Sequence, residues 1–223
     1  MLGKLTSKRG CLIREETYDD KIVSECYAYT KEIDFKDKIV LDIGACFGGF
    51  ARVARDKGAK LVVSYEPDPE NYELLKLNAE RLGSVECKNK AIVLDPSREV
   101  FLYRLEGINK GAHSTVPIRG RDKIKVEGIS FLEELEKYKP SILKIDIEGG
   151  EYDLLREVEI PSFVYYFILE IHTNNTTCRK KLFPELFKKL SQNFEFIQEP
   201  RDSGANRHTT AIMRRKNGKN EIA

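Results

Sequence analysis

The first candidate chemical site is an acid followed by glycines. Asp42 comes at the end of the apolar run 39–41 and precedes glycines at 44, 48 and 49. An apolar run that leads into glycines is typical of a buried strand that ends in a tight turn before a helix. Such a turn lets a ligand approach the backbone, and we expect a side chain at Gly44 or Gly48 to collide with that ligand.

The surrounding residues indicate what the ligand is. Cys46 occupies the place of the second glycine in a dinucleotide-binding loop, and the Asp42 carboxylate disfavours a pyrophosphate but tolerates a sulfonium. Glu66 follows Asp42 by 24 residues, at the end of the apolar segment 61–65. This spacing places an acid where it can accept hydrogen bonds from a ribose diol. The pattern favours S-adenosylmethionine over NAD.

The second candidate site is a group of charges in apolar strand sequence. Lys144, Asp146 and Glu148 alternate with isoleucines, and Glu170 and His172 end the apolar segment 163–171. Charges are costly to bury without partners, so we expect them at the carboxyl ends of strands, where ligands of open α/β sheets bind.

Two mechanisms are consistent with these side chains. In the first, Asp146 is a general base with His172 as its partner, and Lys144 and Glu148 complete the catalytic group. In the second, Asp146 and Glu170 hold a divalent cation that lowers the pKa of an acceptor hydroxyl. Two acids and one histidine are a minimal ligand set, so the sequence favours the base without a metal.

A third feature is a basic segment rich in glycine. Positions 104–125 contain six lysines and arginines against two acids. Basic residues on a loop beside a ligand pocket can recognise an acidic group. The equally weighted alternative is a solvated hairpin. The candidate acceptor contacts are Lys110, His113, Arg119 and Arg121.

The order of the expected elements predicts an α/β domain with a mostly parallel sheet, helices on both faces and a C-terminal antiparallel hairpin. We expect residues 1–223 to form one domain, with a helical cap at 17–37, a core at 38–213 and a basic, disordered tail at 214–223. Helices are expected over 17–33, 50–57, 70–82, 131–138, 152–158 and 183–190. Strands are expected over 39–41, 61–65, 85–87 continued by 91–94, 100–105, 124–126, 142–147, 163–171, 194–197 and 209–213.

Composition bounds the remaining functions. The 223 residues are 33% charged with a formal net charge of +2, which is typical of a globular protein and gives no general reason to expect nucleic-acid binding. No apolar run approaches the roughly 18 residues of a membrane span, and the first ten residues do not resemble a signal peptide. We therefore expect a cytoplasmic protein without membrane contact.

Three motifs, at 40–48, 65–78 and 143–151, resemble the FkbM family of S-adenosylmethionine-dependent methyltransferases. The resemblance implies a class I, Rossmann-like fold and methylation of hydroxyl oxygens on sugars, glycans or similar polyhydroxylated acceptors. Cys46 replaces the asparagine that the family usually has in the glycine loop. By resemblance, the cofactor contacts are Asp42, Gly44, Ala45, Cys46, Gly48, Glu66, Pro67, Asn71, Ala91 and Asp146.

Two other functions remain open. An RNA-directed methyltransferase is suggested by Lys144, Asp146 and the basic segments 104–125 and 201–219, although the modest net charge and lack of a separate RNA-binding domain argue against it. A non-catalytic cofactor-binding protein would keep the glycine loop but would not need the acids at 146–151 and 170.

Overall fold

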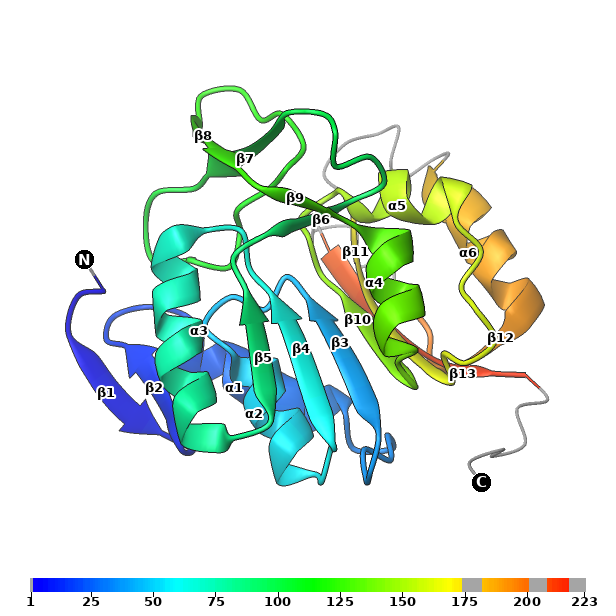
Figure 1. Ribbon diagram of the computed structural model, residues 1–223, viewed down its shortest axis with the longest axis horizontal. Coiled ribbons are helices and arrows are strands. Elements are labelled where there is room, and N and C mark those ends of the chain that lie inside the picture. Colours follow the sequence, from blue (N-terminus) through cyan, green and yellow to red (C-terminus); the bar gives the residue numbers. More distant parts are fainter. Residues whose placement is uncertain (1, 174–181, 201–207, 217–223) are drawn as a thin grey trace.

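The computed structural model describes residues 2–173, 182–200 and 208–216, and its centre is a seven-stranded sheet (Figure 1). Neighbouring strands run parallel except β13, which is antiparallel to both of its neighbours. This arrangement confirms the expected mostly parallel α/β fold with a C-terminal antiparallel hairpin. In spatial order the strands are β12 (Phe194–Gln198), β13 (His208–Arg215), β11 (Tyr166–His172), β10 (Ile142–Ile145), β3 (Ile39–Ile43), β4 (Leu61–Tyr65) and β5 (Val85–Lys88).

The strand order reverses between β3 and β10. From β3 the chain builds outwards through β4 to β5, and it then returns to the other side of β3 to add β10 and β11. The loops that leave β3 and β10 therefore diverge in opposite directions at the same edge of the sheet. Ligands of open α/β sheets bind in the crevice at such a reversal, at the carboxyl ends of the strands.

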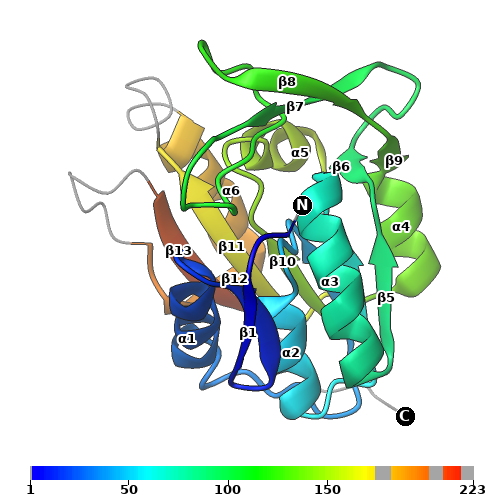
Figure 2. The ribbon, with the colours of Figure 1, turned by 90° about the vertical axis from the view of Figure 1, so that its left-hand side faces the viewer.

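Helices cover both faces of the sheet (Figures 1 and 2). On one face lie α1 (Asp19–Tyr29), α2 (Gly49–Asp56) and α3 (Pro69–Leu82), and on the other lie α4 (Phe131–Tyr138), α5 (Glu151–Glu157) and α6 (Phe183–Asn193). The strands alternate accordingly: Val40 belongs to the core beneath α1 and α2, whereas Leu41 belongs to the core beneath α4 to α6. Period-two alternation of this kind gives a buried sheet two apolar faces.

An N-terminal hairpin, formed by β1 (Leu5–Lys8) and β2 (Cys11–Arg14), was not predicted from the sequence. Its turn is Arg9 and Gly10, both with positive φ (49° and 77°). Positive φ at both central residues is the geometry of a tight hairpin turn. The hairpin is tied to α3, because the Asn78 side chain accepts a hydrogen bond from the Leu12 amide and donates one to its carbonyl.

Two further pairs of strands lie above the carboxyl edge of the sheet (Figure 1). The expected basic hairpin is present as β7 (Val100–Arg104) and β8 (Asp122–Val126), which pair antiparallel. The segment that follows β5 differs from the prediction: β6 (Ala91–Val93) does not continue the third strand of the main sheet but pairs in parallel with β9 (Gly128–Ser130).

The helix ends follow local chemistry. The Asp68 carboxylate accepts hydrogen bonds from the amides of Glu70 and Asn71, and Pro69 begins α3. At the C-terminus the predicted tail begins too early, because Arg214 and Arg215 belong to β13. The Arg215 guanidinium donates to the carbonyls of Ile160, Pro161 and Val164. Residues 217–223 of the predicted tail, and residues 201–207 between the two expected strands of the C-terminal hairpin, lie outside the described residues.

Within the described ranges, the helices are all too short or too polar to cross a lipid bilayer.

Candidate active site

A cavity of about 620 Å³ opens at the carboxyl ends of β3, β4 and β10. Helix α1 contributes to its wall, as does the loop between β7 and β8. This volume lies within the range of small-molecule and cofactor pockets. The residues expected from the sequence that line it are Gly44, Ala45, Cys46, Glu66, Pro67, Asn71, Ala91, His113, Lys144, Asp146, Glu148 and Glu170.

The protein's own packing requires both glycines, whether or not a ligand is bound. Gly44 has φ +83°, and a Cβ there would lie 1.8 Å from the backbone oxygen of Asp146. Gly48 has φ +92°, and its Cβ would lie 2.9 Å from the Leu75 side chain. Gly44 therefore permits the close approach of β3 and β10, whereas Gly48 permits α2 to begin against α3 and does not line the cavity.

Glu66 is buried at the end of β4 and faces the cavity. Its Oε2 accepts a hydrogen bond from the Cys46 amide (2.7 Å), and its Oε1 accepts one from the Asp68 amide (2.8 Å). Burial raises the pKa of Glu66 to about 7, although these two hydrogen bonds oppose the shift. The carboxylate therefore braces the glycine loop and still has lone pairs for a ligand hydroxyl.

Asn71 joins three segments around this end of the cavity. Its Oδ1 accepts a hydrogen bond from Arg14 Nη1 (2.6 Å), and its Nδ2 donates to the Lys110 carbonyl (2.8 Å). Arg14 is itself buried and paired with Asp19 at 2.9 Å. Through these contacts Asn71 holds the N-terminal hairpin and the 107–113 loop in place at this end of the cavity.

Lys144 lines the cavity and lies between two carboxylates. Its Nζ is 3.3 Å from Asp42 Oδ1, 3.4 Å from Asp146 Oδ2 and 3.2 Å from the Gly44 carbonyl. Burial alone would lower the pKa of Lys144, but the two carboxylates outweigh it and the pKa lies above its usual value. Lys144 is therefore an ammonium that fixes the positions of Asp146 and the glycine loop.

Asp42 does not reach the cavity wall. It is fully buried, and its Oδ2 accepts a weak hydrogen bond from Ser64 Oγ at 3.4 Å. Burial raises the pKa of Asp42, with Lys144 opposing the shift. The resemblance implies that Asp42 contacts the methionine portion of the cofactor directly. In the structure Asp42 instead lies under the glycine loop and pairs with Lys144.

His172 is held between carboxylates at the end of β11. Its Nδ1 lies 3.1 Å from Glu151 Oε1, which also accepts the His172 amide at 2.6 Å, and its Nε2 lies 3.4 Å from Glu148 Oε2. Burial alone would lower the pKa of His172, but the hydrogen bonds to Glu148 and Glu151 outweigh it and the pKa lies well above its usual value. His172 does not line the cavity, whereas Glu148 does.

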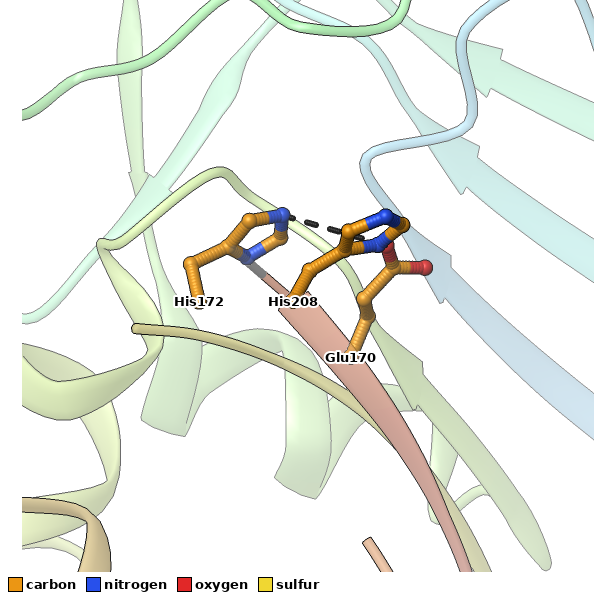
Figure 3. A group of neighbouring side chains, drawn as sticks. All are labelled: Glu170, His172 and His208. Atoms are coloured by element: carbon orange, nitrogen blue, oxygen red, sulfur yellow. Dashed lines mark hydrogen bonds and ion pairs between the residues drawn. The ribbon is translucent and has the colours of Figure 1, made fainter. Parts of the chain in front are cut away.

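His208 is a site residue that the sequence analysis did not predict. It begins β13, lies opposite His172 in the antiparallel register, and pairs with Glu170 (Figure 3). The two imidazole rings stack with their centroids 5.8 Å apart. His208 lines the cavity together with Glu170. The only sequence signal was a histidine at the start of an apolar segment, and no spacing relates it to β11.

The predicted acceptor residues divide into two groups. His113 lines the cavity, accepts a hydrogen bond from the Leu105 amide at its Nδ1 (3.0 Å), and has a pKa lowered by burial to about 4, so its imidazole is neutral. Lys110, Arg119 and Arg121 do not line the cavity. The Arg121 guanidinium instead donates to the carbonyls of Ala112 and Tyr103 and so secures the loop.

With this geometry established, comparison with known sequences identifies the family. Residues 42–197 match the methyltransferase FkbM domain. The chain belongs to the FkbM methyltransferase family. This match confirms the resemblance that the sequence motifs indicated.

A curated relative is the hexuronic acid methyltransferase AglP of Haloferax volcanii. The two sequences are 26% identical over 139 residues, which cover 61% of this chain and 57% of AglP. The chain therefore spans little more than half the length of this relative.

Solved structures show the same fold at low sequence identity. Fibrillarin from Methanococcus jannaschii, a pre-rRNA processing protein, matches with a TM-score of 0.52 at 15% identity. The match covers 97% of this chain and 84% of the fibrillarin chain. A second match is the Streptococcus pneumoniae protein Sp1610, a putative tRNA (m1A22) methyltransferase in complex with S-adenosyl-L-methionine. It has a TM-score of 0.50 at 13% identity, and the match covers 89% of this chain and 74% of the Sp1610 chain. These likenesses confirm the class I, Rossmann-like fold of the chain.

The FkbM match contains most of the cavity but not all of it. Glu66 and Asp146 line the cavity and lie inside the matched residues 42–197. Ile22 of α1 and His208 of β13 also line the cavity, but they lie outside that match. Helix α1 and the start of β13 are therefore parts of the site that the match to the family does not describe.

Proposed function

We propose that this FkbM methyltransferase transfers the methyl group of S-adenosylmethionine to a hydroxyl oxygen of a sugar, glycan or similar polyhydroxylated acceptor. The observation that carries the proposal is one cavity lined both by Glu66, at the end of β4, and by Asp146, at the end of β10. The first acid suits a ribose diol and the second suits an acceptor hydroxyl. Family membership and the name of the AglP relative support the proposal.

The polar and apolar groups of the cavity wall suit the parts of the cofactor. Glu66 would accept hydrogen bonds from its ribose hydroxyls, and Pro67 and Ala91 offer apolar surface for its adenine. The loop 44–46 would hold its methionine portion beside Asp146, whose carboxylate favours the positive sulfonium. Cofactor and acceptor therefore meet beside β10.

The reaction is a displacement at the methyl carbon. The carbon–sulfur bond breaks with its electron pair remaining on sulfur, a carbon–oxygen bond forms to the acceptor, and the hydroxyl proton passes to Asp146. Asp146 is the better base because it lines the cavity, whereas His172 does not and has a carboxylate at each ring nitrogen. Lys144 keeps Asp146 in place.

The charge of the acceptor end favours a hydroxyl-rich ligand over RNA. Asp146, Glu148 and Glu170 line this end of the cavity, and carboxylates accept hydrogen bonds from hydroxyl groups. A nucleic-acid backbone would bring further negative charge to the same surface, and its binding depends on neutralisation by lysine and arginine. The likeness to fibrillarin and Sp1610 concerns the fold alone.

The test supplies S-adenosylmethionine with a labelled methyl group to the purified protein. One series of reactions contains methyl glycosides and uronosides, and a matched series contains unmodified RNA. The proposal expects label on an oxygen of at least one sugar and none on RNA. Label on RNA alone, or no binding of S-adenosylhomocysteine by calorimetry, would overturn it.

A further inference from the structure

We propose that Glu170, His172 and His208 form a binding site for one divalent transition-metal ion, Zn²⁺ or Mn²⁺, at the acceptor end of the cavity. Each of the three residues offers one ligand atom, and these atoms all lie within 4.8 Å of one another (Figure 3). This set differs from the pair that the sequence suggested, because Glu170 is retained while two imidazoles replace Asp146.

The sheet itself holds the three side chains together. Glu170 and His172 are two residues apart on β11, so they project from the same face, and His208 lies opposite His172 on β13. Sites built on strands keep their geometry better than sites built on loops. Glu170 Oε1 lies 3.9 Å from His172 Nε2 and is also the atom that pairs with His208 Nδ1.

Glu151 supplies the orientation that a ligating histidine needs. Its buried carboxylate lies 3.1 Å from His172 Nδ1 and accepts the His172 amide at 2.6 Å. A proton on Nδ1 leaves Nε2, which faces Glu148 and Glu170, with the lone pair that binds a metal. A carboxylate behind a ligating histidine is the usual arrangement around protein-bound zinc.

Charge also favours a cation at this place. Glu148 and Glu170 lie within 4 Å of the His172 ring, and Asp146 and Glu151 add two more carboxylates to the same region. Lys144 is the buried cation beside Asp146. Neutral histidines leave the negative charge of these carboxylates uncompensated. A divalent ion bound by Glu170, His172 and His208 would compensate it.

The ligand types select the kind of metal. Imidazole nitrogens suit Zn²⁺ better than Mg²⁺ or Ca²⁺, which prefer sites made of oxygen ligands. Mn²⁺ suits the carboxylate ligand, and it should bind a mixed nitrogen and oxygen site more weakly than Zn²⁺ does. Three protein ligands leave a coordination position open, which is typical of catalytic metal sites. Glu170 and His208 line the cavity, so a ligand in the open position would enter from it.

The role of the ion rests on the proposed function, although its binding does not. Coordination of the acceptor hydroxyl would lower its pKa and orient its oxygen towards the methyl group, and Asp146 would still receive the proton. No electrons are transferred in this step, so either metal can serve. His208 lies outside the segment that matches the FkbM domain.

Calorimetric titration of the metal-free, full-length protein with ZnCl₂, MnCl₂ and MgCl₂ tests the site, with no cofactor or acceptor present. We expect one site for Zn²⁺ or Mn²⁺ and much weaker binding of Mg²⁺. Loss of a residue that only orients a ligand typically weakens metal binding by about 10- to 100-fold. His208→Ala and Glu170→Gln each remove a ligand itself, so each should weaken metal binding by more than this. His208 is exposed, so its replacement should preserve the fold.

The matched control is Glu195→Gln. Glu195 is also a carboxylate of the main sheet paired with a basic side chain of β13, Arg214, but it lies outside the cluster. The Glu195→Gln protein should bind the metal with the affinity of the natural protein. Absence of saturable binding in the natural protein, or equal affinity in all variants, would overturn the proposal. Metal binding without methyl transfer would instead refute the proposed function and leave the site intact.

Discussion

Gly44 and Asp146 meet across the two central strands so closely that a Cβ on the glycine would lie 1.8 Å from the aspartate's backbone oxygen. The same peptide segments carry the glycine loop and the proposed base, both of which line the cavity. In the proposed reaction, the distance between cofactor and acceptor would therefore depend directly on how β3 and β10 pack.

Gly44→Ala tests this contact. The substitution adds a clash with backbone, which cannot move aside as a flexible side chain can, and it places alanine at φ +83°. We expect loss of S-adenosylhomocysteine binding and a clear fall in melting temperature. Gly120→Ala is the matched control, because Gly120 has φ +81° with nothing within 4 Å of its Cβ. The Gly120→Ala protein should lose only about 1–3 kcal/mol of stability, from the backbone strain at positive φ. Equal effects of the two changes would contradict this account.

Cofactor affinity should depend on pH through Glu66. Burial raises the pKa of this carboxyl to about 7, and ribose hydroxyls donate to its ionised form. Binding should therefore release a proton near pH 7, and the dissociation constant for S-adenosylhomocysteine should increase as pH falls from 8 to 6. Titrations in buffers of different ionisation enthalpy measure both effects. Glu66→Gln should bind more weakly and lose this pH dependence, and a natural protein with constant affinity over this range would argue against ribose binding at Glu66.

Arg14 should hold the N-terminal hairpin against the cofactor end. Arg14→Met removes a buried partner of Asp19 and Asn71, and breaking a buried ion pair costs about 3–5 kcal/mol. Denaturant unfolding should show this loss, and hydrogen exchange should increase in residues 5–14 and 107–113. Lys8→Met, which breaks the exposed pair with Asp20, should cost no more than about 1 kcal/mol. Similar costs for both variants would exclude a structural role specific to Arg14.

Arg121 and Arg119 should behave differently, although the sequence suggested the same role for both. Arg121 donates to two carbonyls of the β7–β8 region, while Arg119 is exposed and away from the cavity wall. Arg121→Met should loosen the loop and raise the Michaelis constants of cofactor and acceptor together. Arg119→Met should leave both within about twofold, since exposed substitutions away from contacts have small effects. If either variant raised the Michaelis constant of the acceptor alone, the sequence-based prediction of direct contact with the acceptor would be supported instead.

The sequence was most informative where local pattern and tertiary structure agree. Helix α4 has the predicted bounds, because Ser130 caps its start and its apolar residues have helical spacing. The acids at 66 and 146 line the cavity because the ends of parallel strands lie at one edge of the sheet.

Other features depended on pairing that sequence spacing does not encode. The meeting of His208 with His172 follows from the antiparallel register of β11 and β13, and the strand at 91–93 pairs with β9 instead of extending β5. The burial of Asp42 beneath the loop depends on its contact with Lys144, 102 residues later in the chain. The basic residues at 104–125 suggested an acceptor site, but Arg104 pairs with Asp68 and Glu70, and Arg121 binds backbone carbonyls.

The central claim is that Asp146 receives the acceptor's proton in a cavity that holds both substrates. It is tested most directly by the methyl-transfer rate of Asp146→Asn, measured with an acceptor of the natural protein and compared with calorimetric affinity for S-adenosylhomocysteine. We predict that kcat/KM for the acceptor falls by about 10²- to 10⁴-fold, the usual contribution of a general base, while cofactor affinity changes by no more than about threefold. A folded Asp146→Asn protein that transfers methyl groups at the natural rate would contradict the claim.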